Sequence, residues 1–371
     1  MLPMREMNSL EISYMRAEMQ KLVGAHVTKI YELGDNEFRF QFHLPECSVD
    51  VACELRKRIH ITKYIKEAPQ TPSQFAMSLR KHLENARVLK IQQHDFDRVL
   101  FFELERERKY FLIFEMFAHG NLILTDENFV VLQCYRREEW RDRKIKTKER
   151  YEFPKTKIKD PRALGDGELR SLFSSEKQVM AVLAREVPVG TVYLEEACAR
   201  AGIQTTKKSN ELRENEIKRL YSEIKTILPA SSPVVYSDGE RAVDFSLTSL
   251  KKYEKSRAAS YATLSEAMDE FYSRVQAQVA EEPEESREKI KLNIQLERQR
   301  AAQEEMLGKA EEKKKTADAI YGNYEMINEI IEAAREMKKK NLSVDELNRE
   351  LKKRFRSFES ADKTGKITVQ T

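Results

Sequence analysis

Short segments in which apolar and polar residues alternate fill most of the first third of the chain, and this period of two constrains the fold more than any other feature. In one of them, Phe38, Phe40 and Phe42 alternate with Arg39 and Gln41. Because Gly, Asn and Asp residues separate several of these segments, we expect tight turns between antiparallel strands that bury one face. The predicted strands cover residues 27–31, 38–42, 49–55, 99–104, 110–116, 122–125 and 129–135.

Two short helices are predicted beside these strands. The first covers residues 8–23, where Asn8 and Glu11 have the spacing of a capping box. The second begins near Pro72, because proline is favoured at the first position of a helix. Helices together with antiparallel strands predict an α+β domain over residues 1–175.

The next hundred residues or so have a different pattern. Residues 177–203 contain two short helical stretches around the sequence VPVGT at 187–191, which predicts a helix-hairpin-helix region over residues 176–228. Residues 229–282 contain a hairpin signal and then a helical pattern, so we expect a small α/β connector there.

The last third carries a heptad-like pattern. From Leu292 to Ala334, positions recur in an unbroken alternation of fours and threes, with polar Gln299, Gln303 and Lys313 among them. This predicts the first half of a long coiled-coil arm over residues 283–358. Since one helix cannot bury its own stripe, we expect the partner to be a second copy or sequence beyond Thr371. Residues 359–371 would form a truncated end.

Composition and charge exclude several classes of protein. The 66 basic residues nearly balance 62 acidic ones, leaving a net charge of +4, so a nucleic-acid surface would have to be a local patch. The four cysteines and six histidines show no spacing typical of a metal site, so we predict reduced cysteines, no metal and no cofactor. The N-terminal stretch lacks the apolar core of a signal peptide, and no segment approaches a membrane span. We therefore expect a cytoplasmic protein that contacts no membrane.

Several segments together resemble the NFACT family of ribosome-associated quality-control proteins, also called fibronectin-binding protein A-like. They are TPSQFAMSLRKHL at 71–83, QHDFDR at 93–98, FEMFAHGNLILTD at 114–126 and YLEEACARAGI at 193–203. They occur in the family's order, and the resemblance as a whole covers nearly the entire chain. The resemblance implies an N-terminal domain like formamidopyrimidine-DNA glycosylase, then a helix-hairpin-helix and a long antiparallel coiled coil. The family's C-terminal RNA-binding domain would be absent.

The resemblance also implies a function. The protein would bind the large ribosomal subunit, with its rRNA, when the subunit carries an obstructed peptidyl-tRNA. It would recruit tRNA for template-independent addition of a C-terminal tail, often alanine, to the stalled chain. Because the ribosome would form the peptide bonds, we expect the protein itself not to be an enzyme.

The family's Asp-Arg pair, needed to engage tRNA, matches Asp97 and Arg98. Arg98 could bind a phosphate or a guanine edge with two hydrogen bonds, while Asp97 could orient it or accept from a base amine. Residue types alone favour a simpler interpretation, in which the two form a salt bridge at the entrance of a strand.

Weaker candidates for tRNA binding surround this pair. Glu11 stands where the family usually has an aspartate, although a capping box explains it equally well. The helix-hairpin-helix loop could bind a phosphate through its amides, but proline at 188 removes one donor, and a structural hairpin is the alternative. Five cations could track phosphates, or each could be a solvated surface charge: Arg56, Arg58, Arg80, Lys81 and Arg87.

Two other functions stay open. A DNA-binding or repair enzyme would keep the glycosylase-like fold, but that chemistry needs an N-terminal proline amine beside a carboxylate, and the chain begins Met-Leu-Pro-Met. A surface adhesin would fit the older family name, yet the expected lack of a signal sequence and the reduced cysteines argue against it.

Overall fold

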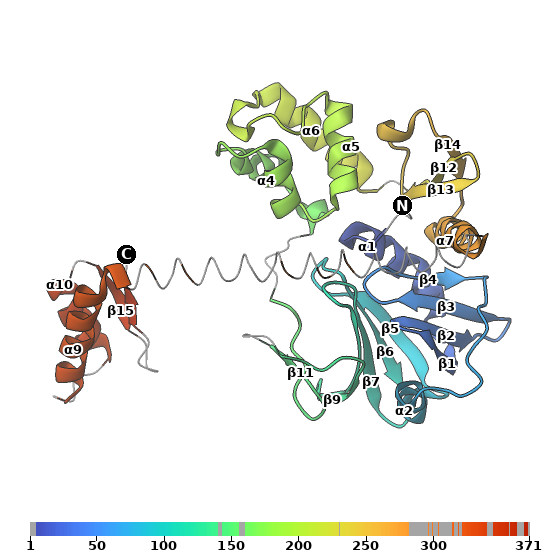
Figure 1. Cartoon of the computed structure of the whole chain (residues 1–371), viewed down its shortest axis with the longest axis horizontal. Helices are drawn as coiled ribbons and strands as arrows, with labels where there is room; N and C mark the ends of the chain where they lie inside the picture. Colours follow the sequence, from blue (N-terminus) through green and yellow to red (C-terminus); the bar gives the residue numbers. More distant parts are fainter. Residues whose placement is uncertain are drawn as a thin grey trace. The chain divides into compact units, whose positions relative to one another are not determined.

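The chain divides into two compact units, Met1–Glu281 and Glu282–Thr371. The computed structural model describes residues 5–139, 143–155, 160–229, 231–281, 321–339, 344–355, 357–361 and 367–369, together with Leu296, Gln299, Gln303, Lys314 and Asp318. The first unit contains a large antiparallel sheet, a group of helices and a small sheet (Figure 1). This confirms the expected combination of helices with antiparallel strands.

A nine-stranded antiparallel sheet is the largest element of the first unit. In spatial order its strands are β4 (Arg58–Thr62), β3 (Ser48–Glu54), β2 (Glu37–His43), β1 (His26–Gly34), β5 (Arg87–Gln93), β6 (Val99–Glu105), β7 (Lys109–Glu115), β8 (Asn121–Asp126) and β9 (Val131–Cys134). Strands β4 and β5 were not predicted from the sequence. Their alternation is obscured because β4 also buries polar side chains, and β5 has an irregular register between Val88 and Lys90.

The sheet folds over on itself where β1 meets β5. Registered pairing between these strands is limited to His26 and Arg87. Four strand spacings separate β2 from β7, which would be roughly 19 Å in a flat sheet. Yet the rings of Phe40 on β2 and Phe114 on β7 lie 5.4 Å apart between centroids. The inner faces of the two halves therefore pack against each other and form the core.

Two helices start as the sequence indicated. Helix α1 (Ser9–Glu18) begins after a capping box of Asn8 and Glu11, which confirms the capping interpretation, and a 3-10 turn, η1 (Met19–Leu22), extends it. Helix α2 (Gln74–Leu83) is capped by Ser73, whose Oγ accepts from the amide of Ala76 at 3.0 Å. The predicted start at Pro72 was therefore two residues early.

The helical part of the first unit contains α3 (Asp166–Leu172), α4 (Val179–Glu186), α5 (Thr191–Ala201) and α6 (Glu214–Ile227), with 3-10 turns η2 (Pro161–Ala163) and η3 (Ser209–Glu211). Residues 187–190 join α4 to α5. Within this loop Gly190 has φ +89°, and a Cβ there would lie 2.6 Å from Asn8 Nδ2. Because only glycine tolerates both the conformation and the contact, the loop docks directly on the start of α1.

A second, three-stranded sheet has the order β13 (Arg241–Ser246), β12 (Val234–Asp238) and β14 (Arg257–Ser260), with η4 (Lys251–Tyr253) in its last connection. Helix α7 (Leu264–Glu281) contacts this sheet, α1 and β4. A two-stranded ribbon of β10 (Glu138–Glu139) and β11 (Lys144–Ile145) lies outside both sheets. One continuous set of buried side chains runs through residues 7–272, so the predicted domains 1–175, 176–228 and 229–282 share a core.

The second unit has its own small core. It contains α9 (Tyr324–Lys339), α10 (Val344–Arg354), β15 (Phe358–Ala361) and β16 (Ile367–Val369), and the two strands pair antiparallel. Ile330 and Ala333 of α9 are buried with Leu351 of α10 and Phe358 of β15. One side of α9 therefore packs against α10 and β15 of the same chain.

Much of the predicted coiled coil, including Leu292 and Met306, lies outside the described residues. In α9 the buried positions also differ in phase from the predicted ones, which were Ile327, Ile331 and Ala334. Residues 344–354 and Phe358, predicted to belong to the arm, form α10 and the start of β15. Where the structure describes the chain, no helix combines the length and the apolar character required to cross a bilayer.

Candidate nucleic-acid interface

Asp97 and Arg98 lie in a strained turn between β5 and β6. Asp95 and Phe96 both have positive φ angles, +40° and +56°, which are uncommon for residues other than glycine. The Phe96 side chain is buried, and the amide of Asp97 donates to the carbonyl of His94 at 2.7 Å. Backbone strain of this kind persists only where surrounding contacts enforce it, and it often marks a functional site.

Asp97 stabilises the turn instead of neutralising its neighbour. Its Oδ1 accepts from the backbone amide of Arg98 at 2.7 Å. Its carbonyl accepts from Gln93 Nε2 at 2.8 Å, and the same amide group also donates to the carbonyl of Ser9 at 2.9 Å. The turn is thus tied to α1.

The guanidinium of Arg98 pairs with a distant carboxylate. Arg98 Nη1 donates to Glu6 Oε2 at 3.1 Å, and Arg56 Nε donates to Glu6 Oε1 at 2.6 Å. Side-chain exposures are 29% for Arg98, 38% for Arg56 and 27% for Glu6, so all three remain accessible to solvent. The local Asp97–Arg98 salt bridge, the alternative from residue types alone, is not formed.

A cavity of about 280 Å³ opens beside Arg98. Besides Arg98 it is lined by Arg5, Glu6, Met7, Asn8, Ser9, Pro188, Gly190, Thr191 and Val192. The last two residues form the first turn of α5, where backbone amides lack acceptors within the helix and the helix dipole favours anions. An arginine and a helix N-terminus facing one cavity can bind a phosphate group.

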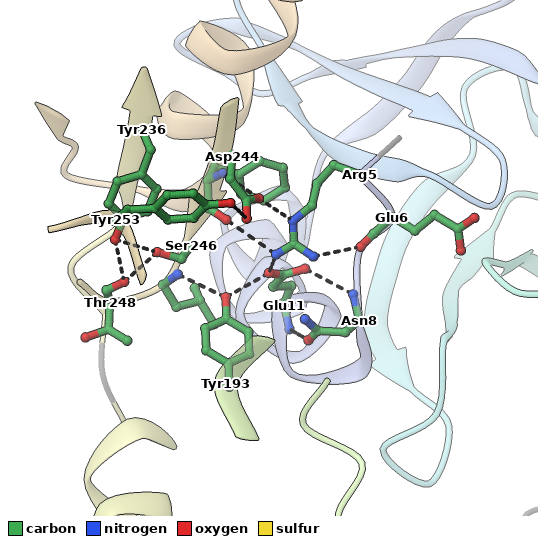
Figure 2. A network of polar contacts seen from close by, with 12 residues as sticks. Arg5, Glu6, Asn8, Glu11, Tyr193, Tyr236, Asp244, Ser246, Thr248 and Tyr253 are labelled. Atoms are coloured by element: carbon green, nitrogen blue, oxygen red, sulfur yellow. Dashed lines mark hydrogen bonds and ion pairs between the residues drawn. The ribbon is translucent and has the colours of Figure 1, made fainter. Parts of the chain in front are cut away.

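Glu11 belongs to a buried polar network instead of this cavity (Figure 2). Its side chain is fully buried and forms an ion pair with Arg5, while the Tyr193 hydroxyl donates to Oε1 at 2.7 Å. Arg5 Nε also lies 3.0 Å from Asp244 Oδ1. Glu11 was predicted from the sequence as a tRNA contact, but its carboxylate is fully buried within this network.

The opposite charges of Arg5 and its partners Glu11 and Asp244 stabilise the ionised forms of these side chains. Burial raises the pKa of Glu11, although Arg5 and the hydrogen bond from Tyr193 favour the ionised carboxylate. Burial alone would lower the pKa of Arg5, but attraction to Glu11, Tyr193 and Asp244 outweighs it, so the pKa of Arg5 is raised. Tyr193 also accepts from the amide of Leu247 at 3.0 Å, so the network joins α1, α5 and the residue that follows β13.

The remaining predicted cations do not form one surface with Arg98. Arg58 is buried, with its guanidinium carbon 4.0 Å from the centre of the Tyr272 ring. Arg80 Nε donates to the carbonyl of Ile30 at 2.8 Å, and exposed Lys81 follows it on α2. Arg87 is exposed at the opposite end of β5 from the turn, about 20 Å away along the strand. Only Arg56 of the five lies beside Arg98.

Sequence reasoning missed three residues of this region: Arg5, Glu6 and Asp244. Their charges are unremarkable among the many charged residues of the chain. No local spacing shows that Glu6 lies near Arg98, because 92 positions separate the two. The sequence pointed to this buried network only through Tyr193, which begins the family-like segment YLEEACARAGI.

The chain is similar in sequence to one protein family and to several of its members. Residues 9–357 match the family described as NFACT N-terminal and middle domains. An archaeal Rqc2 homolog, aRqcH from Methanocaldococcus jannaschii, is 31% identical over 360 residues, which cover 90% of this chain and 53% of the homolog. The ribosome quality control complex subunit NEMF of Homo sapiens is 24% identical over 303 residues, 73% of this chain and 28% of NEMF. The chain thus spans about half the length of the first relative, and less of the second.

A solved structure supports the fold. The fibrinogen binding protein from Staphylococcus aureus superposes with a TM-score of 0.61 at 18% identity, over 71% of this chain and 98% of that protein. At this level of identity the likeness extends to the fold alone.

Proposed function

The chain belongs to the NFACT family, and from this premise we propose that it is a cytoplasmic ribosome-associated quality-control factor. Its relatives named as Rqc2 homologs or as ribosome quality control subunits support this role. In the proposal it binds the large ribosomal subunit with its peptidyl-tRNA, and recruits tRNA for template-independent tailing of the stalled chain. The protein binds and positions, while the ribosome performs the chemistry.

The observation that carries the proposal is that Arg98 and Arg56 both contact Glu6, and that Arg98 and Glu6 line the cavity at the start of α5. Both side chains are partly exposed, and a guanidinium can donate two parallel hydrogen bonds to a phosphate. The net charge of +4 is small, so a local site of this kind is needed to attract a polyanion.

The loop between α4 and α5 contributes to the same proposed surface. Pro188 has no amide hydrogen, but Thr191 and Val192 in the first turn of α5 line the cavity and have amides that can donate to an anion. We therefore assign the phosphate-binding part of the predicted helix-hairpin-helix to the start of α5. The curved antiparallel sheet would then act as the scaffold that holds Arg98 against this helix.

A binding titration tests the proposal. Arg98→Ala in the full chain should weaken binding of deacylated tRNA by about 1.5–3 kcal/mol, roughly tenfold to a hundredfold, because one charge-assisted contact is lost. Arg87→Ala removes the same charge at the far end of β5 and serves as the matched control. Equal losses in the two variants would indicate a non-specific charge effect and would contradict the proposed site.

A further inference from the structure

Glu6 holds two arginines with one carboxylate. Each of its oxygens contacts a different guanidinium, Oε1 that of Arg56 at 2.6 Å and Oε2 that of Arg98 at 3.1 Å. A phosphodiester also presents two charged oxygens from a single centre, and arginine recognises carboxylates and phosphates with the same donor geometry. The Glu6 carboxylate thus occupies a position that suits a phosphate group.

The backbone of Glu6 is fixed, whereas its side chain is not enclosed. Arg5 Nη1 donates to the carbonyl of Glu6 at 3.1 Å, and the amide of Met7 donates to the carbonyl of Lys57 at 2.8 Å. The Glu6 side chain points away from the buried network of Arg5 and Glu11 (Figure 2) and is 27% exposed. Rotation about its side-chain bonds would release both arginines without disturbing the backbone.

We propose that one phosphate group of the bound RNA replaces the Glu6 carboxylate between Arg56 and Arg98. Glu6 is then an internal counter-ion that competes with RNA for these two side chains. This inference rests on the proposed function, because it assumes that Arg98 contacts RNA. It adds a phosphate site that includes Arg56, and a carboxylate that sets the affinity of that site.

The expected strengths of the two interactions favour such a competition. Ion pairs between partly exposed side chains contribute little to stability, so displacing the Glu6 carboxylate costs little. An RNA backbone carries one negative charge per nucleotide and releases counterions when cations bind it. The arginines would therefore exchange a weak internal partner for a phosphate supported by neighbouring contacts. An isolated small anion has no such support, so Glu6 favours polyanions over single anions.

Glu6→Gln tests this inference, with fluorescence anisotropy of labelled deacylated tRNA as the readout. The substitution removes the charge but keeps a side chain of the same shape, so affinity should rise by about three- to tenfold at low salt. Glu105→Gln is the matched control, because Glu105 is an exposed carboxylate at the far end of β6, about 20 Å from Arg98. It should change affinity by less than about twofold.

Double variants separate competition from a general charge effect. In an Arg56→Ala, Arg98→Ala background, Glu6→Gln should produce no gain. An undiminished gain in that background, or a gain equal to that of Glu105→Gln, would overturn the inference. A loss of affinity in Glu6→Gln would also overturn it, since Glu6 would then position the arginines. If Arg98→Ala itself leaves tRNA binding unchanged, the proposed function fails first.

Discussion

The Tyr193 hydroxyl donates a 2.7 Å hydrogen bond to Oε1 of Glu11, although 182 positions separate the two residues. Both side chains are fully buried. The bond connects the first helix of the chain to the helix that lines the proposed phosphate site. It therefore fixes the relative position of α1 and α5, and with it the cavity between them.

Tyr193→Phe should lower the free energy of unfolding by about 1–3 kcal/mol, because a buried carboxylate oxygen and the amide of Leu247 each lose a partner. Urea denaturation followed by circular dichroism measures the change. Tyr221→Phe is the matched control, since the half-buried Tyr221 hydroxyl makes one longer bond, 3.3 Å, to the carbonyl of Leu164. Equal effects would mean that the buried network contributes nothing beyond an ordinary hydroxyl contact.

Stability should fall as the pH drops below about 6.5, the ordinary pKa of histidine. His60 is fully buried, and burial lowers its pKa, with Arg58 adding to the effect and the hydrogen bond to Asp269 opposing it. Between its folded pKa and about 6.5, the unfolded chain binds more protons than the folded chain, so acid favours unfolding.

Asp269 extends this dependence to lower pH. Burial alone would raise the pKa of Asp269, but hydrogen bonds from His60, Thr62 and the amide of Lys63 lower it, so its contribution to stability is lost below about pH 4.

Urea unfolding from pH 8 to 5 tests the contribution of His60, and His60→Gln should give a flatter profile of stability against pH. The same substitution at exposed His43 should leave the profile unchanged. A wild-type slope in His60→Gln would show that other groups carry the pH dependence.

Asp97→Ala should weaken tRNA binding about tenfold with little change in melting temperature, because the turn loses the acceptor that orients the backbone of Arg98. Asp97→Asn keeps an acceptor oxygen and should bind nearly as well as the wild type. Anisotropy titrations beside thermal melts measure both effects. Equal weakening in the two variants would indicate that the negative charge itself contacts RNA.

Binding of tRNA should depend strongly on salt despite the small net charge, because arginine contacts to phosphates release counterions. In a plot of log affinity against log salt concentration, Arg98→Ala should reduce the slope by about one, and Arg87→Ala should leave it unchanged. A flat wild-type plot would exclude phosphates as the main ligand groups.

Ile330→Ala should destabilise the second unit by about 2–5 kcal/mol, because Ile330 is fully buried in its core. Ile327→Ala should cost less, since Ile327 is only half-buried. Hydrogen exchange of the α9 amides in the full chain reports local stability. Faster exchange in Ile327→Ala than in Ile330→Ala would restore the coiled-coil phase predicted from the sequence.

The sequence predicted most strands of the large sheet and the antiparallel class. Period-two alternation and turn residues are local signals, although β7 and β8 bury side chains on both faces of the sheet. The capping box at Asn8 and Glu11 was predictable for the same reason, since three positions separate the two residues. The position of Asp97 and Arg98 at a strand entrance also follows from local pattern, whereas their role came from the family resemblance.

The tertiary structure decided which charged side chains are available. Nothing within a few positions of Arg58 shows that Tyr272 of α7 lies beside its guanidinium, or that Glu11 meets Arg5 and Tyr193. Arg56 joins Arg98 only because β3, β4 and the N-terminal segment bring Glu6 between them. Burial and charge pairing depend on contacts between residues far apart in the chain, and a single sequence records local periodicity but not those contacts.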